Sequence, residues 1–227
     1  MLALKTALTP RQPAHAGAGA DAAAAAPLDL AALVGAEGWS RLPAAVQQRF
    51  ATGHADTVYR GHMDLRCSRL GRVVAVLSAL AGGPLTGSNA QQVPTTVNVR
   101  GNGRGGVVWE RRFHHHAAGG GPHRADRVVR STKEIDTDGR TLRERTDGGL
   151  SMALRVFEDG GALVFESRRY FFVLGRWRLP VPALLSPGVC RVSHRDLGAG
   201  RFRFTLTMTH PLWGETFHQT GVFADPE

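Results

Sequence analysis

The sequence predicts a mainly β protein (α+β) of about ten antiparallel strands, curled into a half-barrel or barrel, with one or two N-terminal helices and a short helix near residues 71–81. Two observations lead to this fold class. From Thr57 onward, apolar residues recur at every second position, which is the period of a half-buried strand. Turns that contain glycine separate these segments at hairpin intervals, so neighbouring strands are expected to run antiparallel.

Residues 201–209 (RFRFTLTMT) show the alternation most clearly, with Phe202 and Phe204 on one face and arginine and threonine on the other. Residues 95–100 and 151–157 repeat it, whereas strands of a parallel sheet would be apolar on both faces. The expected strands span residues 57–66, 95–100, 107–114, 127–135, 141–146, 151–157, 162–172, 189–195, 201–209 and 214–223. A sheet of this size tends to curl or close, because closure removes its exposed edges.

Helical patterns lie mainly before the strands. Residues 28–35 (LDLAALVG) end in a glycine that suits a helix C-cap, and Pro43 suits the first turn of a second helix that presents Val46 and Phe50 on one side. Residues 71–81 lack strict alternation, which favours a short helix, with a buried strand as the alternative. Residues 1–27 are rich in alanine, glycine and proline and predict a disordered leader, so the single β-rich domain would span residues 28–227.

Composition excludes several function classes. The formal net charge of +9 comes largely from scattered arginines, and no nucleic-acid-binding motif accompanies them, so we expect no nucleic-acid partner. No apolar run reaches the roughly 20 residues of a transmembrane helix, and Met1–Leu8 lacks a signal-peptide core, so a cytoplasmic location is expected. Cys67 and Cys190 lack any metal-binding spacing and predict reduced thiols.

The strand of residues 107–113 (VVWERRF) carries the first candidate site. Period two places Trp109, Arg111 and Phe113 on one face, and Glu110 and Arg112 on the other. If Trp109 faces inward, Arg111 enters the interior with it and needs a partner, since a buried charge without one is costly. Glu144 or Glu166 on another strand is a candidate partner, and the alternative is that Arg111 extends to the barrel rim.

A histidine follows the clearest strand directly. His210 continues the face of Phe202 and Phe204, so it is expected to point inward, where it serves either as a hydrogen-bonded structural residue or as a general base. The Pro211 to Gly214 segment after it predicts a corner between two strands. The predicted ligand-binding residues are therefore Trp109, Arg111, Phe113, Phe202, Phe204 and His210.

Other segments predict less chemistry. His114, His115 and His116 stand in a row near His123, but no carboxylate or cysteine completes a ligand set, so we expect no metal. No nucleotide-binding motif occurs, and we expect no cofactor. The apolar segment from Tyr170 to Pro187 contains three prolines, which argue against a central strand and favour either a lid over the barrel mouth or an apolar connection packed on the core.

Several short motifs follow one another between about Leu33 and Phe223: an LP before a helix, an RG in the first strand, a W-x-R-x-F strand, an LP corner, and a closing P-x-x-G with a final glycine. Their order resembles that of a bacterial family known as domain of unknown function 4166. The positions that fit are Arg60, Gly61, Trp109, Arg111, Phe113, Pro180, Pro211, Gly214 and Gly221. The family is uncharacterised, and the resemblance implies that members occur alone or fused to saccharopine dehydrogenase-like NAD(P)-binding oxidoreductases.

Three functions remain open at this stage. We favour non-catalytic binding of a hydrophobic or amphipathic small molecule inside the curved sheet. The alternative is an enzyme or substrate-binding module that works with a separate oxidoreductase, with His210 and Glu110 as weak catalytic candidates and Arg111 or Arg112 holding an anion. A third possibility is an interaction protein whose basic face binds an acidic partner.

Overall fold

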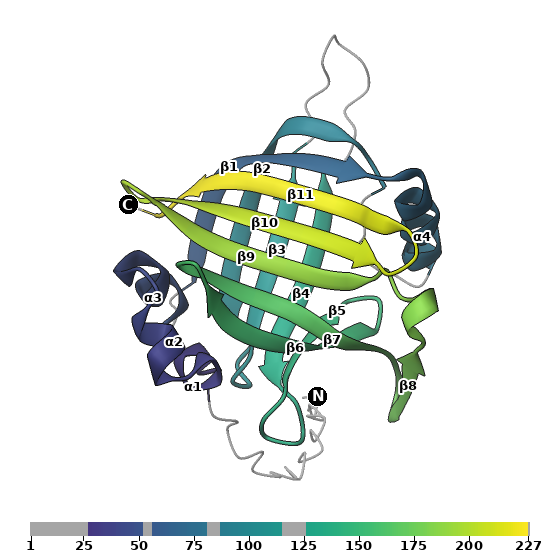
Figure 1. Cartoon of the computed structure of the whole chain (residues 1–227), viewed down its shortest axis with the longest axis horizontal. Coiled ribbons are helices and arrows are strands. Elements are labelled where there is room, and N and C mark those ends of the chain that lie inside the picture. The colour runs from purple at the N-terminus through teal and green to yellow at the C-terminus, as the bar shows by residue number, and fades with distance from the viewer. Residues whose placement is uncertain (1–26, 52–55, 81–86, 115–125, 227) are drawn as a thin grey trace, which may run out of the picture.

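The computed structural model describes residues 27–51, 56–80, 87–114 and 126–226 and shows a closed antiparallel barrel (Figure 1). The strands are β1 Thr57–Cys67, β2 Ala90–Gly101, β3 Val107–Phe113, β4 Arg127–Ile135, β5 Leu142–Thr146, β6 Leu150–Asp159, β7 Ala162–Leu174, β8 Trp177–Val181, β9 Val189–Gly198, β10 Arg201–His210 and β11 Gly214–Ala224. The helices are α1 Leu30–Val34, α2 Ala36–Ser40, α3 Ala44–Phe50, α4 Arg69–Leu80 and the 3₁₀ helix η1 Ala183–Leu185. The predicted fold class is confirmed.

Ten of the strands form the ring, in the order β6-β5-β4-β3-β2-β1-β11-β10-β9-β7, and β6 pairs with β7 to close it. Each predicted strand is present, and α4 confirms the helix near residues 71–81. The predicted leader lies in residues 1–27, of which only Pro27 is described, and His115, His116 and His123 also lie outside the described residues. No helix in the described ranges combines the length and the apolar character that a bilayer crossing requires.

Two local predictions need correction. The helical turn α2 lies between the two predicted N-terminal helices, so the described chain has three short helices there. The proline-rich segment after Tyr170 is also partly a strand, because β7 continues to Leu174 and then turns at Gly175 into β8. Pro180 is compatible with β8 because this strand pairs with β7 alone, and a proline that donates no backbone hydrogen bond is tolerated at a sheet edge.

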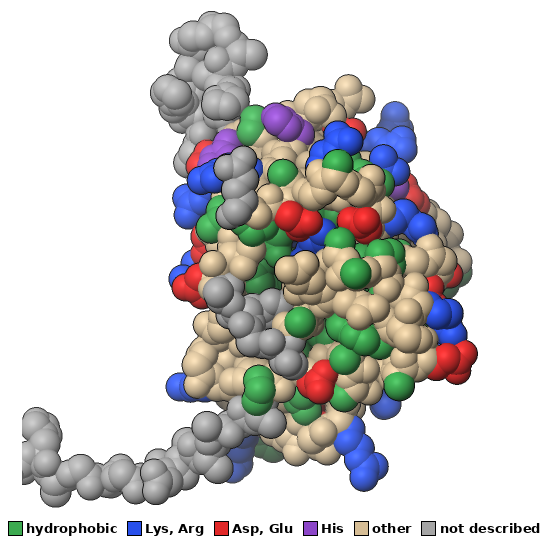
Figure 2. Space-filling model, turned by 90° about the vertical axis from the view of Figure 1, so that its left-hand side faces the viewer, with side chains coloured by type: hydrophobic (Ala, Val, Ile, Leu, Met, Phe, Trp, Pro, Cys, Tyr) green, Lys and Arg blue, Asp and Glu red, His purple; other side chains and the backbone are tan. Residues whose placement is uncertain are grey.

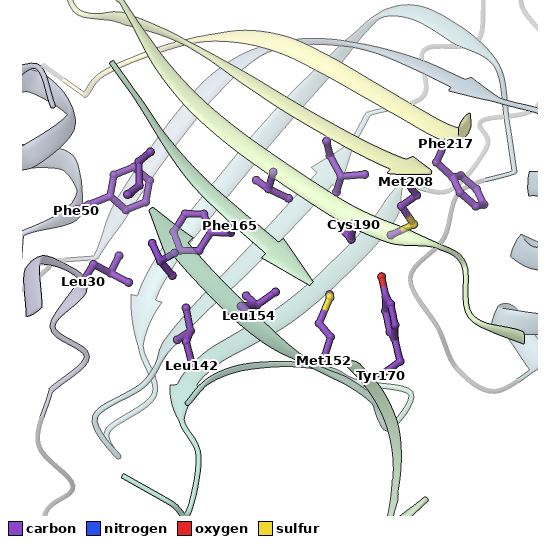
Figure 3. Packing of buried hydrophobic residues seen from close by; sticks show 14 of the residues in the cluster. Leu30, Phe50, Leu142, Met152, Leu154, Phe165, Tyr170, Cys190, Met208 and Phe217 are labelled. Atoms are coloured by element: carbon purple, nitrogen blue, oxygen red, sulfur yellow. The ribbon is translucent and has the colours of Figure 1, made fainter. Parts of the chain in front are cut away.

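The helices α1–α3 lie at one end of the barrel, and the apolar core extends from them through the interior (Figures 1 and 3). In Figure 3, Leu30 and Phe50 lie at the helix end, and Met208 and Tyr170 lie toward the opposite end. Phe50 on α3 is 1% exposed, and its ring stacks on Trp109 with 5.9 Å between ring centroids. Helix α3 therefore contributes directly to the closed interior.

Arg49, the neighbour of Phe50, connects α3 to the end of the chain. Its guanidinium donates two hydrogen bonds to the carboxylate of Asp225, at 2.8 and 2.7 Å, and lies 4.1 Å from the ring centroid of Phe202. The side chain of Arg49 is 2% exposed. Because two parallel bonds between a guanidinium and a carboxylate also fix their mutual orientation, this pair holds α3 over the barrel end.

Glycines allow β1 and β11 to approach closely around the buried ring of Phe223. A Cβ atom at Gly61 would lie 2.1 Å from the carbonyl oxygen of Val222 and 2.8 Å from the Phe223 ring. A Cβ atom at Gly221 would lie 2.6 Å from the carbonyl oxygen of His62. Since the nearest atoms belong to the backbone, an added methyl group would separate the two strands.

We predict that Gly61→Ala lowers the free energy of unfolding by about 3 kcal/mol, because overpacking against a strand backbone cannot be relieved by a side-chain rotation. Urea unfolding followed by circular dichroism measures this change. The matched control is Gly101→Ala on β2, where an added Cβ meets no atom within 4 Å. A Gly61→Ala protein as stable as the Gly101→Ala protein would contradict the role given to the β1–β11 contact.

Candidate functional site

A cavity of about 70 Å³ lies inside the barrel, and strands β1–β6 and β9–β11 supply its wall. Its apolar lining consists of Tyr59, Met63, Val97, Trp109, Met152, Val192, Phe202, Phe204, Leu206, Met208 and Phe223. Its polar lining consists of Arg111, Ser131, Lys133, Glu144, Thr146, Cys190, His194 and Gln219. The cavity thus combines an aromatic and aliphatic wall with several ionisable groups, which is the usual character of a small-molecule site.

Strand register explains why a charged pair lies inside. Lys133 on β4 and Glu144 on β5 are directly opposite each other, so both side chains extend from the same face of the sheet. They form an ion pair with 3.2 Å between Nζ and Oε1, and each residue is 8% exposed. The ammonium group of Lys133 also lies 5.3 Å from the ring centroid of Trp109. The pair is therefore both desolvated and enclosed by aromatic rings.

The pKa of Glu144 shows that this carboxyl group is ionised. Burial by itself would raise its pKa, but the positive charge of Lys133, a hydrogen bond from Ser131 and the charge of Arg111 together lower it below the ordinary value. The cavity therefore contains a carboxylate, and Lys133 is its direct ion-pair partner.

Arg111 is a second cation in the cavity, and Glu144 forms its ion pair with Lys133 and not with Arg111. Its guanidinium donates a hydrogen bond of 3.5 Å to Oε1 of Gln219 and lies 5.5 Å from the ring centroid of Phe204. Burial lowers the pKa of Arg111, and the nearby charge of Glu144 opposes that shift in part. The described cavity lining therefore holds two cations, Arg111 and Lys133, but one carboxylate.

The position of Arg111 favours the inward alternative. Arg111 lines the cavity, and the residue is half-buried. Of its two candidate partners, Glu144 lies near it in the interior, whereas Glu166 pairs with Arg191 at 3.3 Å. Because Glu144 already has Lys133 as its ion-pair partner, Arg111 has capacity for a further anionic acceptor.

His194 is a site residue that the sequence reasoning did not select. It is 4% exposed, lines the cavity, and contacts the rings of Phe50 and Phe204 at centroid distances of 4.8 and 5.3 Å. Its buried Nδ1 atom has no hydrogen-bond partner among the described residues. Burial, followed by the charges of Lys133 and other cations, holds the pKa of His194 well below its ordinary value, so the ring is neutral.

A signal for His194 was present in the sequence. Cys190, Val192 and His194 alternate along β9, so an inward Cys190 and Val192 require an inward His194. Burial raises the pKa of the Cys190 thiol to about 12, which keeps this cysteine protonated and unreactive. The described residues contain no group of three or more histidine, cysteine or acidic side chains placed to hold a metal ion.

The predicted ligand-binding residues separate into two groups. Trp109, Arg111, Phe202 and Phe204 all line the cavity. Phe113 is 1% exposed but belongs to a packed core cluster and not to the cavity lining. These placements follow from the alternation of β3 and β10, whereas the distance of each side chain from the cavity depends on its height along the barrel.

His210 is also buried but lies outside the cavity lining. Its Nε2 lies 3.3 Å from the carbonyl oxygen of Leu184, and its Nδ1 accepts a hydrogen bond of 3.2 Å from the backbone N–H of Leu212. Its ring stacks on Trp213 with 4.0 Å between centroids. Both ring nitrogens are thus engaged with the backbone, and His210 fixes the turn between β10 and β11.

Glu110, the other catalytic candidate, faces away from the cavity. It accepts hydrogen bonds from Arg130 at 2.6 and 3.1 Å and lies 3.4 Å from Arg112 on the same outer face. The hydrogen bond from Arg130 lowers the pKa of Glu110. Glu110 and Arg112 are therefore on the opposite side of the sheet from Arg111, and the structure does not bring these candidates together with His210.

Among the candidate metal ligands, His114 is the described member of the histidine row. Its Nδ1 lies 2.9 Å from Asp126 and its Nε2 lies 2.9 Å from the hydroxyl of Thr96. These two contacts give both ring nitrogens a protein partner. These contacts give His114 a structural role, in which its side chain connects the end of β3 to Thr96 on β2 and to Asp126.

Replacing each cavity cation by methionine should change stability in opposite directions. Arg111→Met removes a half-buried charge that has no ion-pair partner in the cavity and should raise the free energy of unfolding by about 1–3 kcal/mol. Lys133→Met removes the ion-pair partner of Glu144 and should lower the free energy of unfolding by about 3 kcal/mol. Urea unfolding at neutral pH measures both changes. A loss of stability in Arg111→Met equal to that in Lys133→Met would show that Arg111 is already fully matched.

The low pKa of His194 predicts a pH dependence of stability. Below the ordinary histidine pKa of 6.5 the unfolded chain gains a proton at this residue, whereas the native ring stays neutral. Between about pH 7.5 and pH 5.5, the wild type should therefore lose about 1 kcal/mol more unfolding free energy than His194→Phe does. Urea unfolding at the two pH values tests this. Equal losses in both proteins would exclude a buried neutral His194.

Comparison with known proteins supplies the family. Residues 42–223 match the sequence profile of Domain of unknown function (DUF4166), and no curated protein matches the chain. The match includes the motif positions on which the resemblance rested, among them Gly61, Trp109, Arg111 and Gly221. Gly61 and Gly221 lie at the close β1–β11 contact, and Trp109 and Arg111 line the cavity. The chain belongs to the family Domain of unknown function (DUF4166).

Proposed function

We propose that the barrel binds a small amphipathic molecule that carries an anionic group, and that it does so without catalysis. The observation that supports this most directly is Arg111, a half-buried cation in the cavity lining whose described protein contacts are one long hydrogen bond to Gln219 and the face of Phe204. A carboxylate is the natural partner for such a group, because it accepts two parallel hydrogen bonds from a guanidinium.

The balance of free energies supports an anionic ligand. Holding an incompletely paired arginine in an apolar interior costs several kcal/mol, and an incoming carboxylate offsets part of that cost. Water at the same position would provide acceptors but no negative charge. The neutral ring of His194 offers a second polar contact, since its Nδ1 lacks a partner among the described residues.

The rest of the lining suits the apolar part of the ligand. Trp109, Phe202 and Phe204 surround the interior near Arg111 and His194. Aromatic side chains of this kind give large apolar contact areas with little loss of conformational freedom. An amphipathic molecule would therefore place its charged group at Arg111 and its apolar part against these rings.

The size of the cavity limits the ligand. At about 70 Å³ it has room for a few water molecules, while a cavity of about 150 Å³ is known to bind benzene. A short-chain carboxylate is accordingly a better match than a long acyl chain. A longer ligand would have to displace Met152 or Met208, whose unbranched side chains adapt more readily than branched ones.

The geometry gives an enzyme less support. Acid–base catalysis requires its groups within hydrogen-bond reach of one reacting atom. Glu110 faces outward in an ion pair, and His210 is bound to backbone groups outside the cavity. The arrangement of the described candidates therefore favours binding, with or without a separate oxidoreductase as the user of the bound molecule.

Titration with propionate tests the proposal, because a short carboxylate suits a cavity of about 70 Å³; propanol and propylammonium are the neutral and cationic controls of equal chain length. We expect propionate to shift the Trp109 indole N–H signal in ¹H–¹⁵N spectra in a saturable manner, and the controls to bind at least about tenfold more weakly. Arg111→Met should weaken propionate binding by roughly ten- to a hundredfold, because one charge-assisted contact is lost.

The same variant separates this role from a structural one, since Arg111→Met is expected to be folded and more stable than the wild type. Equal binding of propionate and propanol, unchanged propionate binding by Arg111→Met, or no saturable shift with any of the three compounds would overturn the proposal.

A further inference from the structure

The β7–β8 hairpin exposes one face made of large apolar side chains. Phe172 lies opposite Leu179 and Leu174 lies opposite Trp177 in the strand register, so these four side chains share a face. Leu174, Trp177 and Leu179 are 70%, 63% and 52% exposed. This face continues the inward face of β7 from buried Tyr170 (Tyr170 6% exposed) past the end of the barrel wall.

Two neighbouring elements add to this surface. The helix η1 presents Leu184 and Leu185, and the turn after β10 presents Leu212 and Trp213. The hydrogen bond from His210 to the carbonyl of Leu184 holds η1 beside this turn. We call the combined surface the apolar tip; it consists of Phe172, Leu174, Trp177, Leu179, Leu184, Leu185, Leu212 and Trp213, all of them exposed.

Such a surface is unusual for a protein without a partner. Single exposed leucines are common, but a group of eight large apolar residues on adjoining elements marks an interaction site. Figure 1 shows β8 at the end of the barrel opposite α1–α3. Figure 2 faces the α1–α3 end, where basic and acidic side chains lie side by side among the hydrophobic ones. The two ends of the molecule therefore differ in character.

Most charged residues near the tip are arginines, and an exception is Glu215, which follows Trp213 by two residues and pairs with His218. Residues 167–195 contain six arginines and no aspartate or glutamate. Arg176 lies 5.3 Å from the ring centroid of Trp177, and Arg168 and Arg169 line a groove with Val181 and Val189. Arg178 is already paired with Asp136, but no described carboxylate pairs with Arg168, Arg169 or Arg176.

We propose that the apolar tip docks onto the surface of a lipid bilayer that contains anionic headgroups. Leucine side chains gain from leaving water, tryptophan suits the boundary between apolar chains and headgroups, and arginines beside them attract anionic lipid. Charge complementarity favours this occupant over others, because Arg168, Arg169 and Arg176 are exposed and attract a negatively charged surface.

A second copy of the chain fits the tip less well. Two copies that meet at their tips would bring Arg168, Arg169 and Arg176 of each against those of the other, which is repulsive. Pairing through the free edge of β8 is also disfavoured, since this strand has five residues and Pro180 cannot donate a backbone hydrogen bond.

Flotation with lipid vesicles tests the proposal on the full chain. We expect the protein to float with vesicles of phosphatidylcholine and phosphatidylglycerol at about three to one, and to bind pure phosphatidylcholine vesicles roughly tenfold more weakly at low salt. Trp177→Ser and Leu185→Ser should each weaken binding by about tenfold or more, since each removes a side chain that would enter the bilayer.

Control variants are available at exposed positions away from the tip. Leu197→Ser removes a 38% exposed leucine at the end of β9, and Arg100→Gln matches Arg176→Gln as the loss of an exposed arginine. Both controls should bind like the wild type, whereas Arg176→Gln should bind more weakly. Arg111→Met should also bind vesicles normally, because this inference does not depend on the cavity.

Several outcomes would overturn the proposal. These are no flotation with anionic vesicles, equal binding to both vesicle types, or the same loss in Leu197→Ser as in Trp177→Ser. Sedimentation that shows a dimer of the wild type, lost in Leu185→Ser, without any vesicle binding would assign the tip to a second copy. Binding restricted to an acidic protein would assign it to that partner.

Discussion

The interior of this protein depends on the ladder between β1 and β11. This pairing joins the first strand of the chain to the last and closes the ring, whereas most other neighbours in the ring are consecutive strands and β7 pairs with β9 past β8. In the closed ring the inward side chains share one enclosed space. In an open sheet, Lys133, Glu144 and Arg111 would meet water and would need no particular partners. Closure removes these charged side chains from water, so each charge needs a partner inside the barrel to avoid a large desolvation cost.

The interior satisfies this requirement only in part. Lys133 and Glu144 face each other across two adjacent strands and neutralise one another, with Ser131 adding a hydrogen bond. Arg111 and His194 are hydrogen-bonded less completely. Arg111 donates one long hydrogen bond, and Nδ1 of His194 has no partner among the described residues. Incomplete pairing in a folded interior is costly, and such groups are more often found where a ligand completes them.

The two ends of the barrel are covered in different ways. At one end, α3 places Phe50 against Trp109 and the Arg49–Asp225 pair over Phe202, so the helix closes the interior with its own side chains. At the other end, β7 extends beyond the barrel wall with β8 and leaves Leu174 and Trp177 exposed. The apolar face at this end follows from the alternation of β7, because the exposed residues continue the side of the strand that faces inward within the barrel.

The sequence by itself determined the strand alternation and the inward direction of the side chains, because the two-residue period of a strand is a local property. The alternation placed Trp109 with Arg111 and Phe202 with Phe204 on one face of their strands, and all four line the cavity, although the rim remained open for Arg111; the same reading of β9 would have found His194. It did not identify β8, since proline argues against a central strand and the sequence does not say which strand lies at an edge.

Only the tertiary structure decided which inward residues meet. Phe113 and His210 share the inward phase of their neighbours but lie away from the cavity, because position along the barrel depends on the stagger between strands. The partner of Glu144 was likewise fixed by the β4–β5 register, which set Lys133 opposite it and left Arg111 as the unmatched cation. Alternation tells which way a side chain points, but the closure and shear of the barrel decide what it finds there.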